Sequence, residues 1–381
     1  MEYRILRTGL KVGAIALGCE GFADKTAEEV RADFDFAIRN GINFLDLYAS
    51  NPELRSNIGA ALAGRREKFV IQGHLCSVWE EGQYLRTRDP EKSLAAFEDL
   101  LARLGTDYVE IGMIHYVDAE ADLREVLDGP IMRLAQRLRS EGRIRHIGLS
   151  SHNPVVAHMA ARTGLIDVLM FSVNPCYDLL PPSDDVDTLW ADERYARELH
   201  NIDPERQRLY EFCEREGIAI DVMKAYGGGD LLSDANSPFG RPMTPVQCLE
   251  YALTRPGVAA VMAGCRSRAE IEAALGWCSA TAAERDYTGA LAGLDKFSWE
   301  GHCMYCGHCA PCSVGIDIAG VNKYYNLTLA QHEIPETVRE HYRLLPHHAS
   351  ECIACGRCER NCPFGVDIIG HMRLAAAKFG Y

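Results

Sequence analysis

Residues Leu104-Gly105-Thr106-Asp107-Tyr108-Val109-Glu110-Ile111-Gly112-Met113-Ile114-His115 pass from a helical segment into a strand. The helical segment is predicted over Pro90–Leu104 and the strand over Tyr108–His115. The strand is mostly apolar, as parallel strands buried on both faces are. It nevertheless ends on a histidine. This stretch is therefore one unit of an α/β fold with a polar group where the strand stops.

The same unit recurs along the first 290 or so residues. Eight apolar strands are predicted: Gly13–Leu17, Asn43–Asp46, Phe69–Gln72, Tyr108–His115, Arg145–Ser150, Val168–Val173, Ile218–Lys224 and Val258–Ala263. Helices between them include Thr26–Asn40, Pro90–Leu104, Leu123–Arg139, Pro204–Glu216 and Thr244–Thr254. Eight strand-then-helix units predict a closed (β/α)8 barrel, a TIM barrel, rather than an open sheet. Tyr3–Val12 would form a short hairpin across its bottom.

Two connections are longer than such a barrel needs. One runs from His74 to Asp89 and the other from Cys176 to about Asp203. Long connections in compact domains are often functional lids. We therefore expect their aromatic residues to shape the substrate site: Trp79, Tyr84, Tyr177 and Trp190.

Eight of the 15 cysteines lie in two runs near the C-terminus. Cys352, Cys355, Cys358 and Cys362, followed by Pro363, have the C-x2-C-x2-C-x3-C-P spacing of bacterial ferredoxins. Cys303, Cys306, Cys309 and Cys312 form a tighter run with two residues between neighbours. These runs predict two [4Fe-4S] clusters. With the helical segments Ile318–His332 and Glu336–Leu345, they predict a small, mostly helical ferredoxin-like domain over 295–381, after a barrel domain over 1–294.

The two runs are expected to share their ligands. Three cysteines on one short loop bind one cube, and the fourth reaches the other cube, as in two-cluster ferredoxins. We expect Cys362 to complete the first cluster and Cys312 the second. A zinc site, built from two knuckles, fits this spacing poorly. Disulfides are disfavoured in a chain predicted to be intracellular.

Composition narrows the remaining functions. The net charge of −14 disfavours a nucleic-acid surface. No signal-peptide h-region begins the sequence and no apolar run reaches about 18 residues, so we expect a cytoplasmic protein without a membrane span. Two iron–sulfur clusters would also suit an anaerobe.

Polar residues end most of the predicted strands. The active site of a (β/α)8 barrel lies at these carboxyl ends. The candidates there are Asp46, Tyr48, His74, His115, Ser150, Ser151, Asn174 and Lys224. After the last strand, Gly264, Arg266, Ser267 and Arg268 open a helix whose N–H groups and guanidiniums would suit a phosphate.

The first 290 or so residues resemble the aldo-keto reductases. The resemblance rests on Gly41–Asp46, Leu104–Val109 with Ile114-His115, Gly142–Ser150, and Pro256-Gly257-Val258 leading to Gly264. The tail resembles the ferredoxin-like domain attached to one branch of that family. The resemblance implies a small-molecule substrate reduced or oxidised beside a nicotinamide.

The family surrounds the nicotinamide with an Asp, a Tyr, a Lys and a His. Asp46 and His115 carry over, whereas the Tyr position is Asn51 and the Lys position is His74. His115 is then the best remaining acid, because histidine titrates near neutral pH. His74 and Tyr48 come next, and Lys224 would supply a positive charge across the mouth.

The resemblance also places the cofactor. Ser150, Ser151 and Asn174 match regions that hold the carboxamide. Gly264, Arg266, Ser267 and Arg268 match the region that holds the adenosine phosphates, and the two arginines favour NADPH over NADH. Glu270 and Ala274 stand where the family often has amides facing adenine.

Three functions stay open. The first is an NAD(P)H-linked oxidoreductase whose two [4Fe-4S] clusters exchange electrons with a partner. The second takes its electrons from ferredoxin or another electron carrier, with a flavin possible, and dispenses with the nicotinamide mechanism. The third is a redox sensor or binding subunit. Fold similarity alone does not choose among them.

Overall fold

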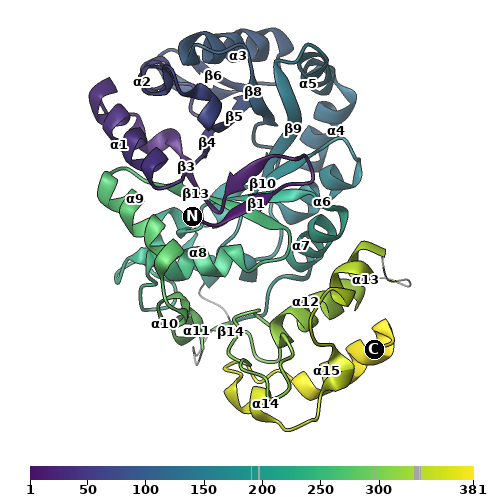
Figure 1. Ribbon diagram of the computed structural model, residues 1–381. Coiled ribbons are helices and arrows are strands. Elements are labelled where there is room, and N and C mark those ends of the chain that lie inside the picture. The colour runs from purple at the N-terminus through teal and green to yellow at the C-terminus, as the bar shows by residue number, and fades with distance from the viewer. Residues whose placement is uncertain (190, 196–197, 293, 295–296, 330–333, 335) are drawn as a thin grey trace.

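The predicted barrel is confirmed in the computed structural model, which describes residues 1–189, 191–195, 198–292, 294, 297–329, 334 and 336–381. Eight parallel strands close in the order β10-β12-β13-β3-β4-β5-β8-β9 (Figure 1). They are β3 (Ile15–Gly18), β4 (Phe44–Leu47), β5 (Val70–Leu75), β8 (Val109–Ile114), β9 (Ile144–Ser151), β10 (Val168–Ser172), β12 (Ala219–Met223) and β13 (Val258–Gly264).

Helices surround the barrel and connect its parallel strands. They are α1 (Ala27–Arg39), α2 (Pro52–Leu62), α3 (Pro90–Leu104), α4 (Glu120–Asp128), α5 (Pro130–Ser140), α6 (Pro154–Arg162), α7 (Pro204–Glu216), α8 (Pro245–Leu253), α9 (Arg268–Leu275), α10 (Ala282–Arg285) and α11 (Thr288–Leu291). Many begin with a side-chain cap and a proline, whose missing N–H costs nothing in the first turn. Asp89 before α3 and Asp203 before α7 are examples.

The barrel is closed at its amino-terminal end by the predicted hairpin. Strands β1 (Tyr3–Ile5) and β2 (Lys11–Gly13) pair antiparallel. Arg4 donates to the carbonyl of Val258 at 2.6 Å, and the Asn43 amide donates to Lys11 at 2.8 Å. Both contacts lie where barrel strands begin. The opposite, carboxyl-terminal end is therefore the mouth.

One predicted helix is wrong. The segment Leu123–Arg139 forms two helices, α4 and α5, that break at Gly129. Gly129 has an extended backbone, with φ −92° and ψ −170°. Pro130 cannot donate to the preceding turn, and its ring disfavours a helical conformation in the residue before it.

The two long connections differ in kind. After β5 the chain forms a hairpin of β6 (Ser77–Glu80) and β7 (Gln83–Arg86), in which Trp79 faces Tyr84. Glu81 and Gly82 have φ of 52° and 79°, the left-handed pair that a tight two-residue hairpin requires. After β10 the chain forms short 3-10 turns, including Tyr177–Leu179 and Val186–Leu189, and then β11 (Leu199–His200). Trp190 lies outside the described residues.

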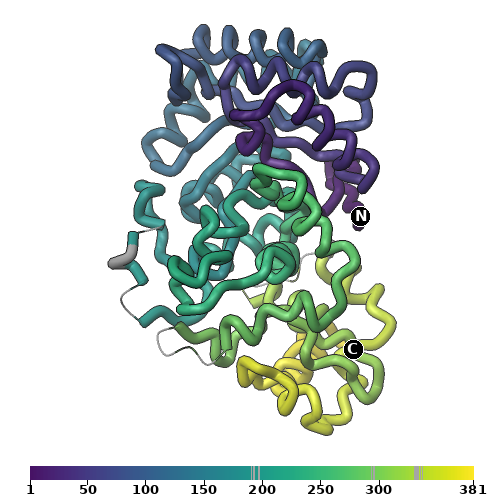
Figure 2. The backbone as a smooth tube through the Cα atoms, turned by 90° about the vertical axis from the view of Figure 1, so that its left-hand side faces the viewer, coloured from purple at the N-terminus to yellow at the C-terminus, as the bar shows by residue number. Residues whose placement is uncertain are grey.

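The C-terminal part is mostly helical, as predicted. It contains β14 (Phe297–Ser298), α12 (Ile318–Leu329), α13 (Glu336–Arg343), α14 (Arg357–Asn361) and α15 (Ile368–Phe379). The predicted helix to His332 is described only as far as Leu329. Figures 1 and 2 place this part, in yellow-green, beside the barrel near α7 and α11. The short strands β11 and β14 pair, and Lys323 bridges to Glu214 at 2.7 Å.

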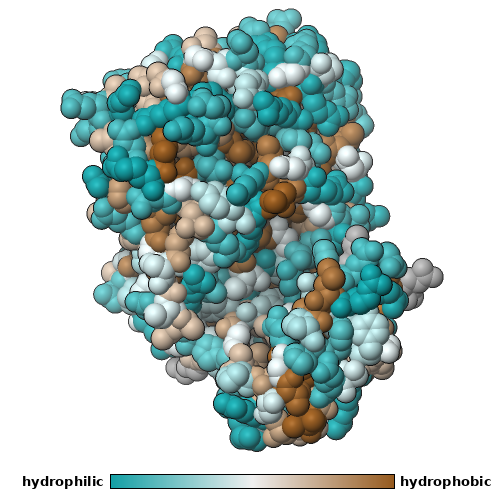
Figure 3. Space-filling view, in the orientation of Figure 1, coloured by the Kyte–Doolittle hydropathy of each residue, from teal (hydrophilic) through white to brown (hydrophobic). Residues whose placement is uncertain are grey.

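The surface in Figure 3 is largely hydrophilic, with strips of hydrophobic residues on the C-terminal part. The exposed apolar side chains there include Leu329, Leu344, Ile353 and Leu374. Among the described helices, none has the length and apolar character to cross a bilayer.

Candidate functional site

A chain of hydrogen bonds begins at Asp46 in the barrel mouth. Asp46, at 4% exposure, is the third residue of β4. Its Oδ1 accepts from Gln72 Nε2 at 2.9 Å and lies 2.8 Å from His74 Nε2. The same Gln72 amide donates to Asp221 Oδ2 at 2.8 Å. Burial raises the pKa of Asp221 well above its ordinary value.

The chain continues outward through both histidines. His74 Nδ1 lies 2.8 Å from His115 Nδ1, and His115 Nε2 lies 2.7 Å from the hydroxyl of Tyr84. His74 is 1% exposed, whereas Tyr84 is 37% exposed. The chain therefore connects a buried carboxylate to a phenol that solvent or a substrate can reach.

Only one set of proton positions lets both histidines stay neutral and face an ionised Asp46. His74 must donate from Nε2 to the carboxylate, so its Nδ1 is an acceptor. His115 then donates from Nδ1, which leaves its Nε2 to accept from the Tyr84 hydroxyl. All three hydrogen bonds point toward Asp46.

The pKa of His115 supports this assignment. Burial lowers the pKa of His115 well below the ordinary histidine value, and the guanidiniums of Arg88 and Arg86 act in the same direction. Neutral His115 can accept at one ring nitrogen and donate at the other, which protonated imidazole cannot. Burial also raises the pKa of Tyr84 to about 12, so the phenol keeps its proton at neutral pH.

The β6–β7 hairpin holds Tyr84 over the mouth. Arg86 donates to the carbonyl of Tyr116 at 2.9 Å, and Arg88 donates to the carbonyl of His115 at 2.9 Å. Arg88 also pairs with Asp122 at 2.7 Å. The hairpin is thus tied to the loop after β8, which fixes Tyr84 against His115.

Tyr48 lies beside this chain without a hydrogen bond to either histidine among the described contacts. Its ring is stacked on that of His115, at 5.4 Å between centroids and 4° between planes. Burial, followed by the carboxylate of Glu20, raises the pKa of Tyr48. Tyr48 is therefore placed to fix the orientation of the His115 ring, while its own hydroxyl faces Glu20.

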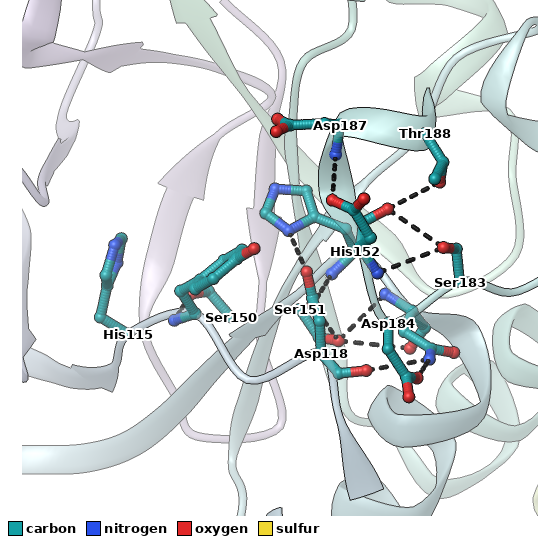
Figure 4. A network of polar contacts seen from close by, with 12 residues as sticks. His115, Asp118, Ser150, Ser151, His152, Ser183, Asp184, Asp187 and Thr188 are labelled. Carbon is teal, nitrogen blue, oxygen red and sulfur yellow. Dashed lines mark hydrogen bonds and ion pairs between the residues drawn. The ribbon is translucent and has the colours of Figure 1, made fainter. Parts of the chain in front are cut away.

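A second polar network lies across the mouth. Asp118 accepts from the backbone and the ring of His152, at 2.6 and 2.9 Å, and from Ser151 Oγ at 3.0 Å. Figure 4 shows His152 between Asp118 and the loop that carries Asp184 and Asp187. These bonds outweigh burial and lower the pKa of Asp118.

Lys224 belongs to this second side of the mouth. It ends β12 in a left-handed conformation, with φ 59°. Burial lowers the pKa of Lys224, and the charges of Asp118 and Glu20 oppose that change. Lys224 therefore lies within electrostatic reach of both Asp118 and Glu20, the carboxylate beside Tyr48.

The residues predicted to hold the carboxamide already have partners. Asn174 accepts from the backbone N–H groups of Cys176 and Tyr177, at 3.0 and 2.9 Å, and donates to the carbonyl of Lys224 at 2.9 Å. Ser150 Oγ accepts from the backbone of Tyr116 at 2.7 Å. Among the described contacts, Ser150 Oγ has no acceptor for its own hydrogen.

The predicted phosphate region is open but carries a carboxylate. Gly264 and Arg266 are exposed, and a Cβ built on Gly264 would meet nothing within 4 Å. Ser267 caps α9. Glu270 accepts from the backbone N–H of Arg266 at 2.6 Å, and Arg268 lies over the Phe36 ring at 4.4 Å. A phosphate bound here would compete with Glu270 for the backbone N–H of Arg266.

The eight cysteines surround two cavities. One, of about 380 Å³, is lined by Cys312, Cys352, Cys355 and Cys358. The other, of about 320 Å³, is lined by Cys303, Cys306, Cys309 and Cys362. Each cavity thus has three cysteines from one run and the last cysteine of the other run, as the predicted sharing of ligands requires. Cluster binding by these cysteines stays a prediction. No three His, Cys, Asp or Glu side chains of the described chain are placed to hold a single metal ion.

Comparison with known proteins establishes the family. Residues 10–247, more than half of the chain, match the Aldo/keto reductase family, and residues 302–367 match the 4Fe-4S dicluster domain. The chain belongs to the aldo-keto reductases. Its matched relatives include a protein described as an oxidoreductase, and the 4Fe-4S dicluster match follows the reductase match in the chain.

Individual relatives are distant. An uncharacterized oxidoreductase YqkF of Bacillus subtilis is 28% identical over 179 residues, 45% of this chain and 56% of that protein. A glyoxal reductase of the same species is 28% identical over 234 residues, 60% of this chain and 69% of that protein. The chain spans about half the length of the first curated relatives that it matches. Aldo-keto reductase AKR11C1 from Bacillus halodurans, in its holo form, shares the fold with a TM-score of 0.58 and 23% identity, over 75% of this chain and 94% of that one.

Sequence reasoning missed several members of the site. Tyr84 was expected only to shape the substrate site. Gln72, Asp118 and Glu20 were not predicted as site residues. Asp118 could have been found, since it follows the end of β8 by a few residues. Tyr84 could not, because its contact with His115 depends on how the hairpin folds back.

Proposed function

We propose that the protein interconverts a small carbonyl compound and its alcohol at the barrel mouth, using NAD(P)H, with Tyr84 as the group that exchanges a proton with the substrate oxygen. The chain of hydrogen bonds from Tyr84 through His115 and His74 to Asp46 carries this proposal. The family's own tyrosine position is Asn51, which here caps α2 by accepting from Leu54 at 2.9 Å. Tyr84 reaches the mouth from a different element and replaces that phenol.

Bound nicotinamide would supply or take up the hydride, and the protein's residues manage the proton. When an alcohol is oxidised, its proton passes to Tyr84 as the phenol gives its own proton to His115 Nε2. His115 passes its Nδ1 proton to His74, and His74 passes its Nε2 proton to Asp46. Reduction starts from the form in which Asp46 carries the proton and runs these shifts in reverse, so Tyr84 protonates the carbonyl oxygen. Between turnovers the same chain carries the proton between Asp46 and solvent at Tyr84, the exposed end of the chain.

The cysteine-lined cavities support an added electron-transfer role. Cys303, Cys306, Cys309 and Cys362 would hold one [4Fe-4S] cluster, and the other four cysteines would hold the second. Cys355 is exposed at the second cavity, and its neighbour Ile353 is 62% exposed. An electron carrier such as a ferredoxin could approach there, which favours electron exchange with a partner over a purely structural role.

An anaerobic titration tests the proposal. The purified protein is examined by visible spectroscopy, and NADPH or NADH is then added, with and without a panel of small aldehydes and ketones. We expect nicotinamide oxidation that depends on a carbonyl compound and that His115→Ala abolishes without loss of the cluster absorbance. Failure to bind either nicotinamide would overturn the proposal. A flavin absorbance band would favour the flavin-linked alternative instead.

A further inference from the structure

A buried arginine lies where the barrel meets the first cysteine run. Arg255 precedes β13 and is 2% exposed. Its Nη2 donates to the carbonyl of Met304, which lies between Cys303 and Cys306 in the chain. Tyr287 donates to the same carbonyl at 2.7 Å. Arg255 is therefore a barrel residue in direct contact with the loop that lines one cavity.

None of the groups that Arg255 hydrogen-bonds among the described residues is charged; the carboxylate that acts on it, Asp178, is shared with Arg206, whose Nη1 lies 3.4 Å from Asp178 Oδ1. Besides Met304, its guanidinium donates to the carbonyl of Tyr251 and the hydroxyls of Thr254 and Tyr287, all at 3.2 Å. Each of these acceptors is a neutral oxygen. Its Nη1 atom is buried and has no hydrogen-bond partner within the described residues. A buried charge in such surroundings is costly unless an anion lies nearby.

The neighbouring cysteines would supply that anion. Met304, whose carbonyl Arg255 binds, lines the same cavity as Cys303, Cys306, Cys309 and Cys362. Four thiolates around a [4Fe-4S] core make a group of net negative charge, which becomes more negative by one unit on reduction. A fixed positive charge nearby stabilises the reduced form more than the oxidised form.

The cavity lined by Cys312, Cys352, Cys355 and Cys358 has no buried arginine among its described lining residues. The arginine that lines it, Arg357, is exposed, and Arg360, which donates to the carbonyl of Cys355 at 3.4 Å, is exposed as well. Water and salt screen exposed charges strongly. The two cavities therefore differ in their electrostatic surroundings.

We propose that Arg255 raises the reduction potential of the cluster held by Cys303, Cys306, Cys309 and Cys362. This inference rests on the proposed binding of two clusters and adds a specific role for a barrel residue in tuning one of them. Net charge and hydrogen bonds near the sulfurs are among the properties that set such potentials. Through Arg255, the barrel itself would determine how readily the cluster nearest to it accepts an electron.

A redox titration followed by electron paramagnetic resonance tests this role. The full-length protein, with both clusters, is compared with Arg255→Gln, Arg255→Lys and the exposed control Arg357→Gln. The relevant centre is identified as the one lost in Cys362→Ser. For Arg255→Gln we expect the ratio of reduced to oxidised cluster at a fixed potential to fall at least tenfold, about 59 mV for one electron. Arg255→Lys and Arg357→Gln should leave that centre close to the wild-type potential.

The outcomes are distinct. An unchanged potential in a fully loaded Arg255→Gln protein would overturn the inference, as would a shift in Arg255→Lys equal to that in Arg255→Gln. If Arg255→Gln does not fold, the redox titration is made on Arg255→Lys and Tyr287→Phe instead, because both variants keep a positive charge at position 255. An unchanged potential in both then supports the inference, and a tenfold change in either overturns it. Wild-type protein without the iron of two clusters would instead refute the proposed cluster binding, on which this inference rests, and would leave the proposed carbonyl chemistry untouched.

Discussion

His74 and His115 share a hydrogen bond through their Nδ1 atoms, which lie 2.8 Å apart. Such a contact needs one proton between the two rings, so one histidine must donate and the other accept. Asp46 decides which, because its carboxylate lies against Nε2 of His74. The position of a buried acid thus sets the direction of hydrogen bonding at a tyrosine on a surface hairpin.

The first prediction concerns Tyr84. Tyr84→Phe removes the hydroxyl that contacts His115 but keeps the ring that faces Trp79 in the hairpin. We expect kcat for carbonyl reduction to fall by about 10²-fold or more, the usual contribution of a positioned acid. Nicotinamide affinity should change little. Steady-state kinetics and a nicotinamide binding titration measure the two effects.

Tyr116→Phe is the matched control for this prediction. Tyr116 also lies at the mouth, with its ring 5.5 Å from that of His152, but it is not part of the chain to Asp46. Its variant should retain activity within a few-fold of the wild type. Equal losses in the two variants would show that Tyr84 has no special role in proton transfer.

The sequence predicted the fold and much of the site because both depend on local patterns. The apolar strands and the polar residues that end them located Asp46, His74 and His115. The hairpin was not predicted, because Glu81-Gly82 is a weak turn signal and the strands around it have little apolar alternation. Without the hairpin, the position of Tyr84 could not be predicted. Because the family tyrosine position is Asn51 in this chain, the sequence did not identify the proton donor.

The phosphate region shows a similar limit. The spacing of Arg266, Ser267 and Arg268 after β13 indicated an anion site, and the structure does place Ser267 at the start of α9. The sequence did not show that Glu270 folds back onto the backbone of Arg266. That contact depends on a side-chain rotamer, which spacing alone does not determine.

The second prediction concerns the pH dependence of stability. Because the pKa of His115 is lowered in the folded protein, the unfolded chain binds more protons than the folded one as the pH falls below the ordinary histidine pKa of about 6.5. The free energy of unfolding should therefore decrease on acidification through this range. Since His152 also has a lowered pKa, it adds to the same slope.

Replacing His115 isolates its share of this slope. In His115→Gln the free energy of unfolding should fall less steeply between pH 6.5 and more acidic values than in the wild type. Urea unfolding at a series of pH values measures both slopes. A steeper slope in the variant would mean that His115 is charged in the folded protein, contrary to the assignment of its protons.

The third prediction concerns Glu270. Glu270→Gln removes a negative charge from the amino end of α9, where it stabilises the helix but repels a phosphate. We expect nucleotide affinity to rise about two- to five-fold while stability falls by about 0.3–1 kcal/mol. Fluorescence titration with NADPH and thermal unfolding measure the two changes. Glu272→Gln, which alters only the partner of Arg268 at 3.4 Å, is the control and should not increase affinity.

The last prediction concerns the crossed cysteines. Cys362 is in the second run of the sequence but lines the cavity of the first run, and Cys312 does the reverse. Cys362→Ser should therefore weaken the cluster of Cys303, Cys306 and Cys309, and Cys312→Ser should weaken the other. Combining each variant with a substitution in one run distinguishes this from uncrossed ligation. Cys362→Ser with Cys306→Ser should cost one cluster, whereas Cys362→Ser with Cys355→Ser should cost both, as measured by iron content and paramagnetic resonance. If the second pair instead costs only one cluster, each run binds its own cube.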